Sequence, residues 1–276
     1  MLKSDSKVNT KVNIQEMIGA IASGKLRADL HNHSLYSDGK STPEEIVLSA
    51  IDKRLDVIGI SDHAPVGFKD ARWSIRREKI DEYIYVLGEL KEKYKDKITL
   101  LTGLEVDYYK DCDEHIKALR LTRFDYTIGS VHFFSIKKAV GDYYGIDSSP
   151  IELAAAIVQA KGVVQNVCQD YFTYIVKAAK SGYFSFVGHF DLIKKYNFDS
   201  TYFVESEEWY QTMSKLALAE IAAANIPMEI NTSASRKGHN DYYPSKFLVE
   251  EARRLGITLI TNSDSHHKDE VGYGQG

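Results

Sequence analysis

Cysteine, positive charge and long apolar runs are scarce in this sequence, and each shortage excludes a class of protein. Cys112 and Cys168, two cysteines among 276 residues, are too few for a disulfide scaffold or a thiolate zinc site, and they favour a reduced, cytoplasmic setting. The net charge of −4 provides no basic field, so nucleic acid is not expected as the main partner. No apolar run approaches the length of a membrane span, and residues 1–13 lack the apolar stretch of a signal peptide. We therefore expect no membrane partner, and these observations leave the oligomeric state open.

Linkers, low-complexity tracts and clear repeats are also missing. We expect a polar leader with a short helix over residues 1–26, followed by one domain over residues 27–276. Seven nearly continuous apolar runs predict parallel strands covered on both faces, at residues 27–30, 56–60, 99–106, 126–131, 184–188, 227–230 and 258–261. Helical patterns lie at residues 13–23, 43–54, 75–94, 113–121, 151–160, 166–181, 205–224 and 245–255.

Polar motifs follow almost every predicted strand. An open doubly wound sheet would show one glycine-rich loop and ligands from two or three strands. In a barrel of parallel strands, all strand ends meet at one mouth, where active sites form. We therefore predict an α/β fold of the (β/α) barrel type, with seven strands and with the functional site at the C-terminal mouth of the strands.

Histidines stand beside acids or other histidines at the ends of the apolar runs. The motifs are DLHNHS (29–34), SDH (61–63), GSVHF (129–133), GHFD (188–191) and SDSHH (263–267). Neutral imidazole is the commonest metal ligand in proteins. Several strands that each end in a histidine would therefore build a metal centre at one rim of the fold.

Spacing and burial select the candidate ligands. His31 and His33, at i and i+2 of an extended segment, point the same way, and Asp29 on that side is expected to orient a ligand. Glu105 lies inside an apolar run, where a carboxylate is costly unless it is paired or bound to metal. Asp107 shares its face and is the alternative ligand at this strand. The predicted set is His31, His33, Asp38, His63, Glu105, His132, His189, Asp264 and His266.

The predicted ligands supply nitrogen and oxygen but no thiolate. Such a set suits Zn, Mn or Fe, and the order of affinities does not choose among them. Nine ligands are too many for one ion, so we expect two to three divalent ions with Glu105 as a bridge. His115, His239 and His267 lack the required strand context or direction and are left out of the set.

At this point the motifs DLHNHSLYSDG, ISDHAP, GLEVDYY, IGSVHF, GHFDLIKKY and NSDSHH resemble, in order, those of the PHP (polymerase and histidinol phosphatase) family over residues 27–276. GLEVDYY, DYTIGSVHF and EINTSASRKGHNDYYPS resemble the histidinol-phosphatase branch. The resemblance implies a distorted (β/α)7 barrel with three metal ions. It places His31, His33, Glu105 and Asp264 on one ion, Glu105, His132 and His189 on the second, and Asp38, His63 and His266 on the third.

The resemblance also implies the reaction, a small phosphorylated substrate and a place in histidine biosynthesis. L-Histidinol phosphate would be hydrolysed to L-histidinol and phosphate by a hydroxide that bridges two ions, without a phosphoenzyme. Glu105, His63 and Asp264 are the predicted catalytic residues, with His63 or Asp264 protonating the leaving group through metal-bound water. Arg236 and Lys237 are expected to hold the phosphate, with Lys194 and Lys195 as weaker candidates. The stretch over residues 134–150 resembles the family only loosely, and it too is a candidate for substrate contact.

Three other interpretations remain open. One is a PHP phosphoesterase of broader specificity, a nucleotidase or a phosphodiesterase. Another is an amidohydrolase-like barrel, which also uses an H-x-H motif and a late aspartate, although the GSVHF and GHFD motifs fit it less well. The third is a non-catalytic barrel with structural metals, whose coordination would be closed.

Overall fold

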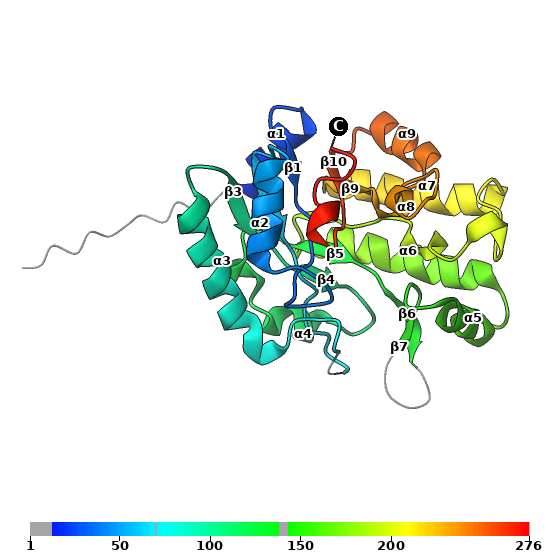
Figure 1. Cartoon of the computed structure of the whole chain (residues 1–276). Coiled ribbons are helices and arrows are strands. Elements are labelled where there is room, and N and C mark those ends of the chain that lie inside the picture. The colour runs from blue at the N-terminus through cyan, green and yellow to red at the C-terminus, as the bar shows by residue number, and fades with distance from the viewer. Residues whose placement is uncertain (1–12, 70, 138–142, 276) are drawn as a thin grey trace, which may run out of the picture.

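The computed structural model describes residues 13–69, 71–137 and 143–275, in which parallel strands alternate with outer helices (Figure 1). The strands are β1 (Ala28–Asp29), β2 (Val57–Ile60), β3 (Thr99–Thr102), β4 (Glu105–Asp107), β5 (Ile128–Ser130), β6 (Phe133–Lys137), β7 (Tyr143–Gly145), β8 (Phe186–Val187), β9 (Met228–Asn231) and β10 (Leu259–Asn262). The helices are α1 (Ile14–Ala22), α2 (Pro43–Asp52), α3 (Ile80–Tyr94), α4 (Asp113–Ala118), α5 (Pro150–Gln159), α6 (Val164–Lys180), α7 (Glu208–Ala224), α8 (Ser233–Arg236) and α9 (Lys246–Arg254). Short 3₁₀ turns are η1 (Arg77–Lys79), η2 (Leu121–Arg123), η3 (Leu192–Lys194), η4 (Phe198–Ser200) and η5 (Lys268–Glu270).

The strands of these three ranges form two parallel sheets and one antiparallel hairpin. The first sheet has the order β1-β2-β3, and the second has the order β10-β9-β8-β5-β4. Every pairing within the two sheets is parallel, which confirms the predicted α/β class. Because parallel strands carry their carboxyl ends to the same edge, the motifs after them are brought to one side of the molecule.

The strand predicted over residues 99–106 is divided in two. β3 pairs with β2, whereas β4 pairs with β5, so the chain changes sheets at Gly103 and Leu104. The phenol of Tyr126 explains the glycine, because a Cβ on Gly103 would lie 2.2 Å from its Cζ. This change of sheet places Glu105 between the two sheets, beside the ends of both.

Hydrogen bonds also link the two sheets beyond the ends of the named strands. The His33 N–H donates to Ser265 O at 2.8 Å, which joins the segment after β1 to the segment after β10. On the other side, the Ala64 N–H donates to Glu105 O at 2.7 Å, joining the segment after β2 to β4. Both links lie at the carboxyl ends, where the predicted ligands are.

A small apolar core lies between the sheets. It takes side chains from β1, β2, β3, β5, β8 and β10 and from the segments beside them, namely Ala28, Leu30, Val57, Leu101, Tyr126, Ile128, Phe186 and Ile260. Ile18 of α1 belongs to the same core, and Ile14, Met17 and Ile21 pack against it. The short helix predicted over residues 13–23 therefore covers the amino-terminal side of the sheets, while the ligand motifs occupy the carboxyl side.

Most predicted helices are present, with shifted ends. The start of α2 follows the expected signal, because Thr42 and Glu45 form a reciprocal capping box around Pro43. The helix predicted from residue 75 begins as α3 at Ile80, after the turn η1. The hairpin β6–β7, which projects next to α5 (Figure 1), and the short helix α8 were not predicted. Among the helices that the structure describes, none is both long and apolar enough to cross a membrane.

Candidate metal centre

Each strand end delivers one or two of the predicted ligands. His31 and His33 follow β1, His63 follows β2, and Glu105 begins β4. His132 follows β5, His189 follows β8, and Asp264 and His266 follow β10. Asp38 comes from the loop before α2, and Gly39 allows that loop to approach closely, since a Cβ there would lie 2.2 Å from His33 O. All nine predicted ligands are thereby brought together, and their binding of metal stays a prediction.

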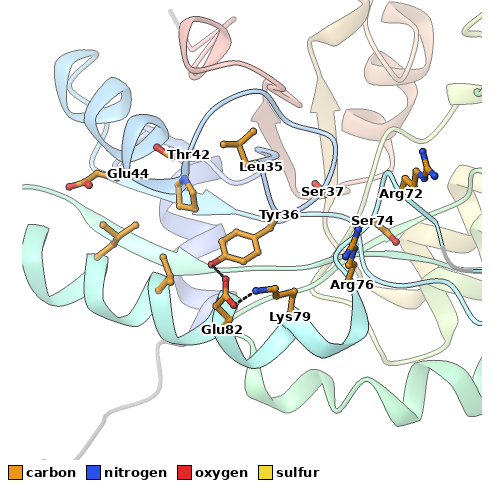
Figure 2. A pocket seen from close by; sticks show the side chains of 13 residues that line it. Leu35, Tyr36, Ser37, Thr42, Glu44, Arg72, Ser74, Arg76, Lys79 and Glu82 are labelled. Atoms are coloured by element: carbon orange, nitrogen blue, oxygen red, sulfur yellow. Dashed lines mark hydrogen bonds and ion pairs between the residues drawn. The ribbon is translucent and has the colours of Figure 1, made fainter.

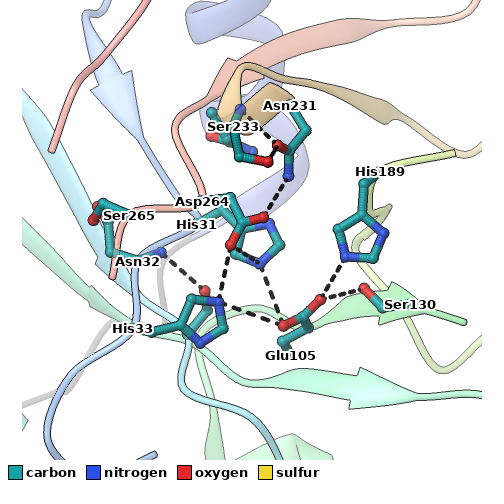
Figure 3. Close-up of polar contacts among 12 residues, drawn as sticks. His31, Asn32, His33, Glu105, Ser130, His189, Asn231, Ser233, Asp264 and Ser265 are labelled. Atoms are coloured by element: carbon teal, nitrogen blue, oxygen red, sulfur yellow. Dashed lines mark hydrogen bonds and ion pairs between the residues drawn. The ribbon is translucent and has the colours of Figure 1, made fainter. Parts of the chain in front are cut away.

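One carboxylate oxygen of Glu105 faces three histidines. Glu105 Oε2 lies 3.4 Å from His31 Nε2, 3.5 Å from His33 Nε2 and 2.9 Å from His63 Nδ1 (Figure 3 shows His31, His33 and Glu105). The side chains of Glu105, His31 and His33 are essentially inaccessible to solvent. A buried carboxylate surrounded by imidazoles on this side has the arrangement of a shared ligand.

The other oxygen of Glu105 faces a second group. Glu105 Oε1 lies 3.0 Å from His189 Nε2 and 3.7 Å from His132 Nε2, and it accepts a hydrogen bond from Ser130 Oγ at 2.6 Å. The Nε2 atoms of His132 and His189 are 3.2 Å apart. Glu105 is therefore positioned to contribute one oxygen to each of two neighbouring sites.

Asp38, Asp264 and His266 complete the outer side of the cluster. Asp38 lies 3.3 Å from His266 Nε2 and 3.7 Å from His63 Nε2. Asp264 lies 3.3 Å from His33 Nε2 and adopts a left-handed backbone with φ of 52°. Such a conformation is uncommon outside glycine and clusters at functional sites, and Asp tolerates it better than most residues.

The unpaired buried atoms of the cluster fit the binding of divalent ions. Buried atoms without a hydrogen-bond partner include His31 Nε2, both ring nitrogens of His33, His63 Nδ1 and Glu105 Oε2. Buried polar atoms are almost always paired, so several of them pointing at one another require an explanation. Across the described ranges there are four overlapping sets of residues, and within each set the ligating atoms lie within 4.8 Å of one another. Together the four sets contain all nine predicted ligands. Lone pairs of nitrogen and oxygen that converge in this way match the donor preference of transition-metal ions.

Burial and neighbouring charges shift the pKa values of residues in the cluster in the metal-free protein. Burial raises the pKa of Glu105, but the imidazoles of His63 and His31 outweigh burial and hold that pKa well below its usual range. Burial lowers the pKa of His63, but Glu105 and Asp38 outweigh it and raise that pKa to about 9. At His33, burial and the neighbouring His266 and His63 lower the pKa to about 4.

Glu229 is a member of the site that the sequence analysis missed. Its side chain is fully buried in β9, and its carboxylate contacts His31 Nδ1 at 3.0 Å. It also accepts hydrogen bonds from the backbone N–H of His189 at 2.8 Å and from the side-chain amides of Asn231 and Asn262, both at 2.9 Å. A carboxylate on the far nitrogen of a metal-binding histidine fixes the ring and its tautomer. The sequence did contain a signal for Glu229. Like Glu105, it is an acidic residue within an apolar run that predicts a strand.

Two predictions about neighbouring acids change with the geometry. Asp107 is outside the sets of ligating atoms and instead contacts His132 Nδ1 at 2.7 Å, so it supports a predicted ligand. Asp29, which was expected to orient a ligand, contacts the backbone of His31 and not its ring: the His31 backbone N–H donates to Asp29 Oδ1 at 3.4 Å. Asp29 accepts hydrogen bonds from the backbone of Ser263 and Gly272 and so anchors the segment after β10. The ring of His31 is held by Glu229 instead.

The basic residues predicted to bind phosphate differ in burial and in the groups that they contact. Arg236 in α8 donates to Ser263 O and, at 2.9 Å, to Asp264 O, so it braces the backbone on which Asp264 lies. Lys237 is exposed and interacts electrostatically with Asp264. Lys194 is buried, and its ammonium group lies 2.9 Å from Asp241, 3.4 Å from Asp191 and 3.8 Å from Glu205. Because its ammonium group is surrounded by three carboxylates, Lys194 is already paired. The structure therefore gives no support to a contact between Lys194 and phosphate.

A cavity lies next to the Asp38 loop but apart from the cluster. It has a volume of about 730 Å³ and is lined by Leu35, Tyr36, Arg72, Arg76, Lys79 and Glu82, among others (Figure 2). None of the nine predicted ligands lines it. Glu82 is already paired with Lys79 and accepts a hydrogen bond from Tyr36 at 3.2 Å. This cavity is therefore separate from the cluster at the strand ends.

Comparison with known proteins agrees with this arrangement. Residues 29–233 match the family described as the PHP domain, which covers more than half of the chain. The chain belongs to the PHP family. The resemblance inferred from the sequence motifs is confirmed at this level.

Relatives of this PHP-family chain are named as histidinol phosphatases. A protein of Deinococcus radiodurans named "Probable histidinol-phosphatase" is 29% identical over 89% of this chain and 88% of its own length. The histidinol-phosphatase of Bacillus subtilis is 26% identical over 90% of this chain and 96% of its own length. The match to the histidinol-phosphatase branch is therefore carried along nearly the whole chain.

Solved structures support the fold of the PHP-family chain. A candidate histidinol phosphatase from Listeria monocytogenes superposes with a TM-score of 0.80 at 23% identity, covering 90% of this chain and 98% of the other. Histidinol phosphate phosphatase from Lactococcus lactis, in complex with zinc, L-histidinol and phosphate, superposes with a TM-score of 0.68 at 21% identity, covering 88% of this chain and 87% of the other.

Proposed function

We propose that this protein is a metal-dependent phosphomonoester hydrolase that converts L-histidinol phosphate to L-histidinol and phosphate. The observation that carries the proposal is the convergence of nine nitrogen and oxygen ligands in overlapping sets, among which Glu105 presents its two carboxylate oxygens to different groups of histidines. Relatives named histidinol-phosphatase that span about nine tenths of the chain support the choice of ester. A small phosphorylated substrate fits a mouth formed by strand ends.

The barrel is part of the proposal. The two parallel sheets are linked by hydrogen bonds beyond β1 and β10 and beyond β2 and β4, and six strand positions contribute to one internal core. These observations support a distorted (β/α)7 barrel in which β3 and β4 together count as one strand. The metal centre then lies at its C-terminal mouth.

Two to three divalent ions are proposed for the cluster. The zinc bound in the structure of the Lactococcus lactis relative supports zinc as their identity. His31, His33, Glu105 and Asp264 would hold one ion, and Glu105, His132 and His189 a second. Asp38, His63 and His266 would hold the third. Ions bound here would neutralise phosphoryl charge and lower the pKa of a bound water to about 7.

The protein's own groups prepare the site for this chemistry. Glu105 stays ionised because the surrounding imidazoles lower its pKa, so it can share its charge between two sites. Glu229 and Asp107 orient His31 and His132, and Arg236 fixes the backbone of Asp264. His63 and Asp264 remain the proposed candidates for delivering a proton to the departing alcohol.

The first experiment combines metal analysis with a screen for phosphate release. Purified protein should contain two to three transition-metal ions per chain and should release phosphate from L-histidinol phosphate faster than from other phosphomonoesters. A metal-replete protein that is inert on this ester, yet active on a nucleotide or a phosphodiester, would replace the proposed substrate by the broader alternative.

A second experiment tests the bridging residue. Glu105→Gln keeps the size of the side chain but removes the charge shared by two sites, so we expect loss of most activity and of part of the bound metal. Glu220→Gln, an identical change at an exposed ion pair between α6 and α7, is the control. Activity of Glu105→Gln close to that of the control would rule out a bridging role.

A further inference from the structure

An ion pair between Lys195 and Asp147 lies beside the cluster of predicted ligands. Lys195 donates a hydrogen bond to Asp147 at 3.1 Å, and the two side chains are 26% and 21% exposed. Asp147 is absent from the sets of ligating atoms found in the described ranges. Both side chains are half-buried, so this is neither a freely exposed surface pair nor a fully enclosed one.

The backbone fixes this pair at the mouth, next to two predicted ligands. Asp147 follows β7, and its neighbour Ile146 donates a backbone hydrogen bond to His132 O at 2.9 Å. The phenol of Tyr196 donates to Asp147 O at 2.7 Å. Lys195 follows the turn η3, which starts three residues after His189. The pair therefore joins the segment after β7, which is hydrogen-bonded to the backbone of His132, to the segment after β8, which carries His189.

The charges of this pair and those of the cluster influence one another. Burial would raise the pKa of Asp147, but Lys195 and His132 outweigh burial and hold it below its usual range, so the carboxylate is ionised at neutral pH. Lys195 interacts with Asp264 as well as with Asp147. A negative and a positive group thus stand side by side at the rim, each partly open to solvent.

We propose that Asp147 and Lys195 form the subsite that selects a phosphomonoester carrying an ammonium group on its alcohol portion. Asp147 binds the ammonium group of the substrate, and Lys195 binds an oxygen of the phosphate. The pair is complementary in charge to such a zwitterionic ester, and in the free protein each member serves as the counter-ion of the other. Lys194 and Lys195 were both predicted as weaker phosphate contacts, and Lys195 takes this role because Lys194 is enclosed by carboxylates. The inference rests on the proposed function and names how the same site chooses its substrate.

The test compares L-histidinol phosphate with a matched ester that lacks only the α-amino group. For Asp147→Asn we expect KM for L-histidinol phosphate to rise about tenfold, the typical effect of losing one hydrogen bond to a charged group, while KM for the matched ester changes less than about twofold. For Lys195→Gln we expect kcat/KM to fall by about the same factor for both esters, since both carry the phosphate. Asp147→Glu, which keeps the charge, should recover part of the selectivity.

The controls separate this subsite from the metal centre. The metal content of both variants should equal that of the wild type, and Glu220→Gln should leave both esters unaffected. An equal loss on both esters in Asp147→Asn, or unchanged kinetics in Lys195→Gln, would overturn the inference while leaving the proposed function intact. A metal-replete wild-type enzyme that fails to hydrolyse L-histidinol phosphate would overturn the proposed function and the inference together.

Discussion

At the scale of single residues, the centre depends on acids that are buried among histidines. Glu105 was predicted from one signal, a carboxylate in an apolar run, because burial of such a group requires a partner. Glu229 carries the same signal and is fully buried, yet the sequence does not say whether such an acid touches the ion or the far side of a ligand. That distinction depends on the direction of the side chain, which the contact with His31 Nδ1 decides.

Replacing Glu229 tests its support of His31. Glu229→Gln keeps the volume and removes the negative charge, so His31 loses the partner that fixes its tautomer. We expect metal affinity to fall about 10- to 100-fold, measured by retention of metal in competition with a chelator. Retention equal to that of Glu220→Gln would contradict the role.

Protonation of the cluster predicts how the stability of the metal-free protein depends on pH. Burial opposes the charge of His63 and His132, but acidic neighbours outweigh burial and raise their pKa values from 6.5 to about 9 and about 10. A histidine with a raised pKa stabilises the folded state fully below its unfolded pKa, and this contribution is lost as the pH rises through the folded pKa. Thermal denaturation of chelator-treated protein should therefore show a Tm that falls from pH 6.5 to 9. A rising Tm over this range would contradict the assignment.

At the scale of elements, the strands could be located but their breaks and pairings could not. The run over residues 99–106 predicts one strand, and nothing in its apolar pattern shows that it leaves one sheet for the other at Gly103. The cause is a distant side chain, Tyr126, which crosses close to both Gly59 and Gly103 and donates to Leu30 O at 2.6 Å. The start of α2 was predictable because its capping box involves residues three apart.

The contact between β2 and Tyr126 predicts a specific clash. A Cβ on Gly59 would lie 2.2 Å from the Tyr126 hydroxyl, so Gly59→Ala should lower the free energy of unfolding by about 1–3 kcal/mol in urea denaturation. Tyr126→Phe alone should cost about 1 kcal/mol through the lost hydrogen bond to Leu30 O. The double variant should be more stable than the sum of the two losses implies, because the hydroxyl that clashes is gone. Strict additivity would argue against this clash.

At the scale of the whole molecule, bound ions should act as a clamp between the two sheets. Ligands from the ends of β1, β2, β5, β8 and β10 and from β4 meet in one cluster, and several of their buried atoms have no hydrogen-bond partner. Binding to the folded state alone stabilises it by about 2.7 kcal/mol per site at a hundred times Kd. For a chain of this size that is on the order of 5–10 °C in Tm, so a chelator should lower Tm by at least this amount and added zinc should restore it. A Tm that is insensitive to chelator would speak against ions in the cluster.

The sequence by itself determined the alternation of strands and helices, the family and the identity of the nine candidate ligands. These features depend on local periodicity and on short motifs, which can be read without knowing any distant contact. Only the tertiary structure decided which oxygen of Glu105 faces which histidines. It also decided that Glu229 and Asp107 contact the Nδ1 atoms of His31 and His132. Finally, it decided that Lys195, and not Lys194, pairs with Asp147. The physical reason is that these relations are set by the register of strands far apart in the chain and by the direction of each side chain across the mouth.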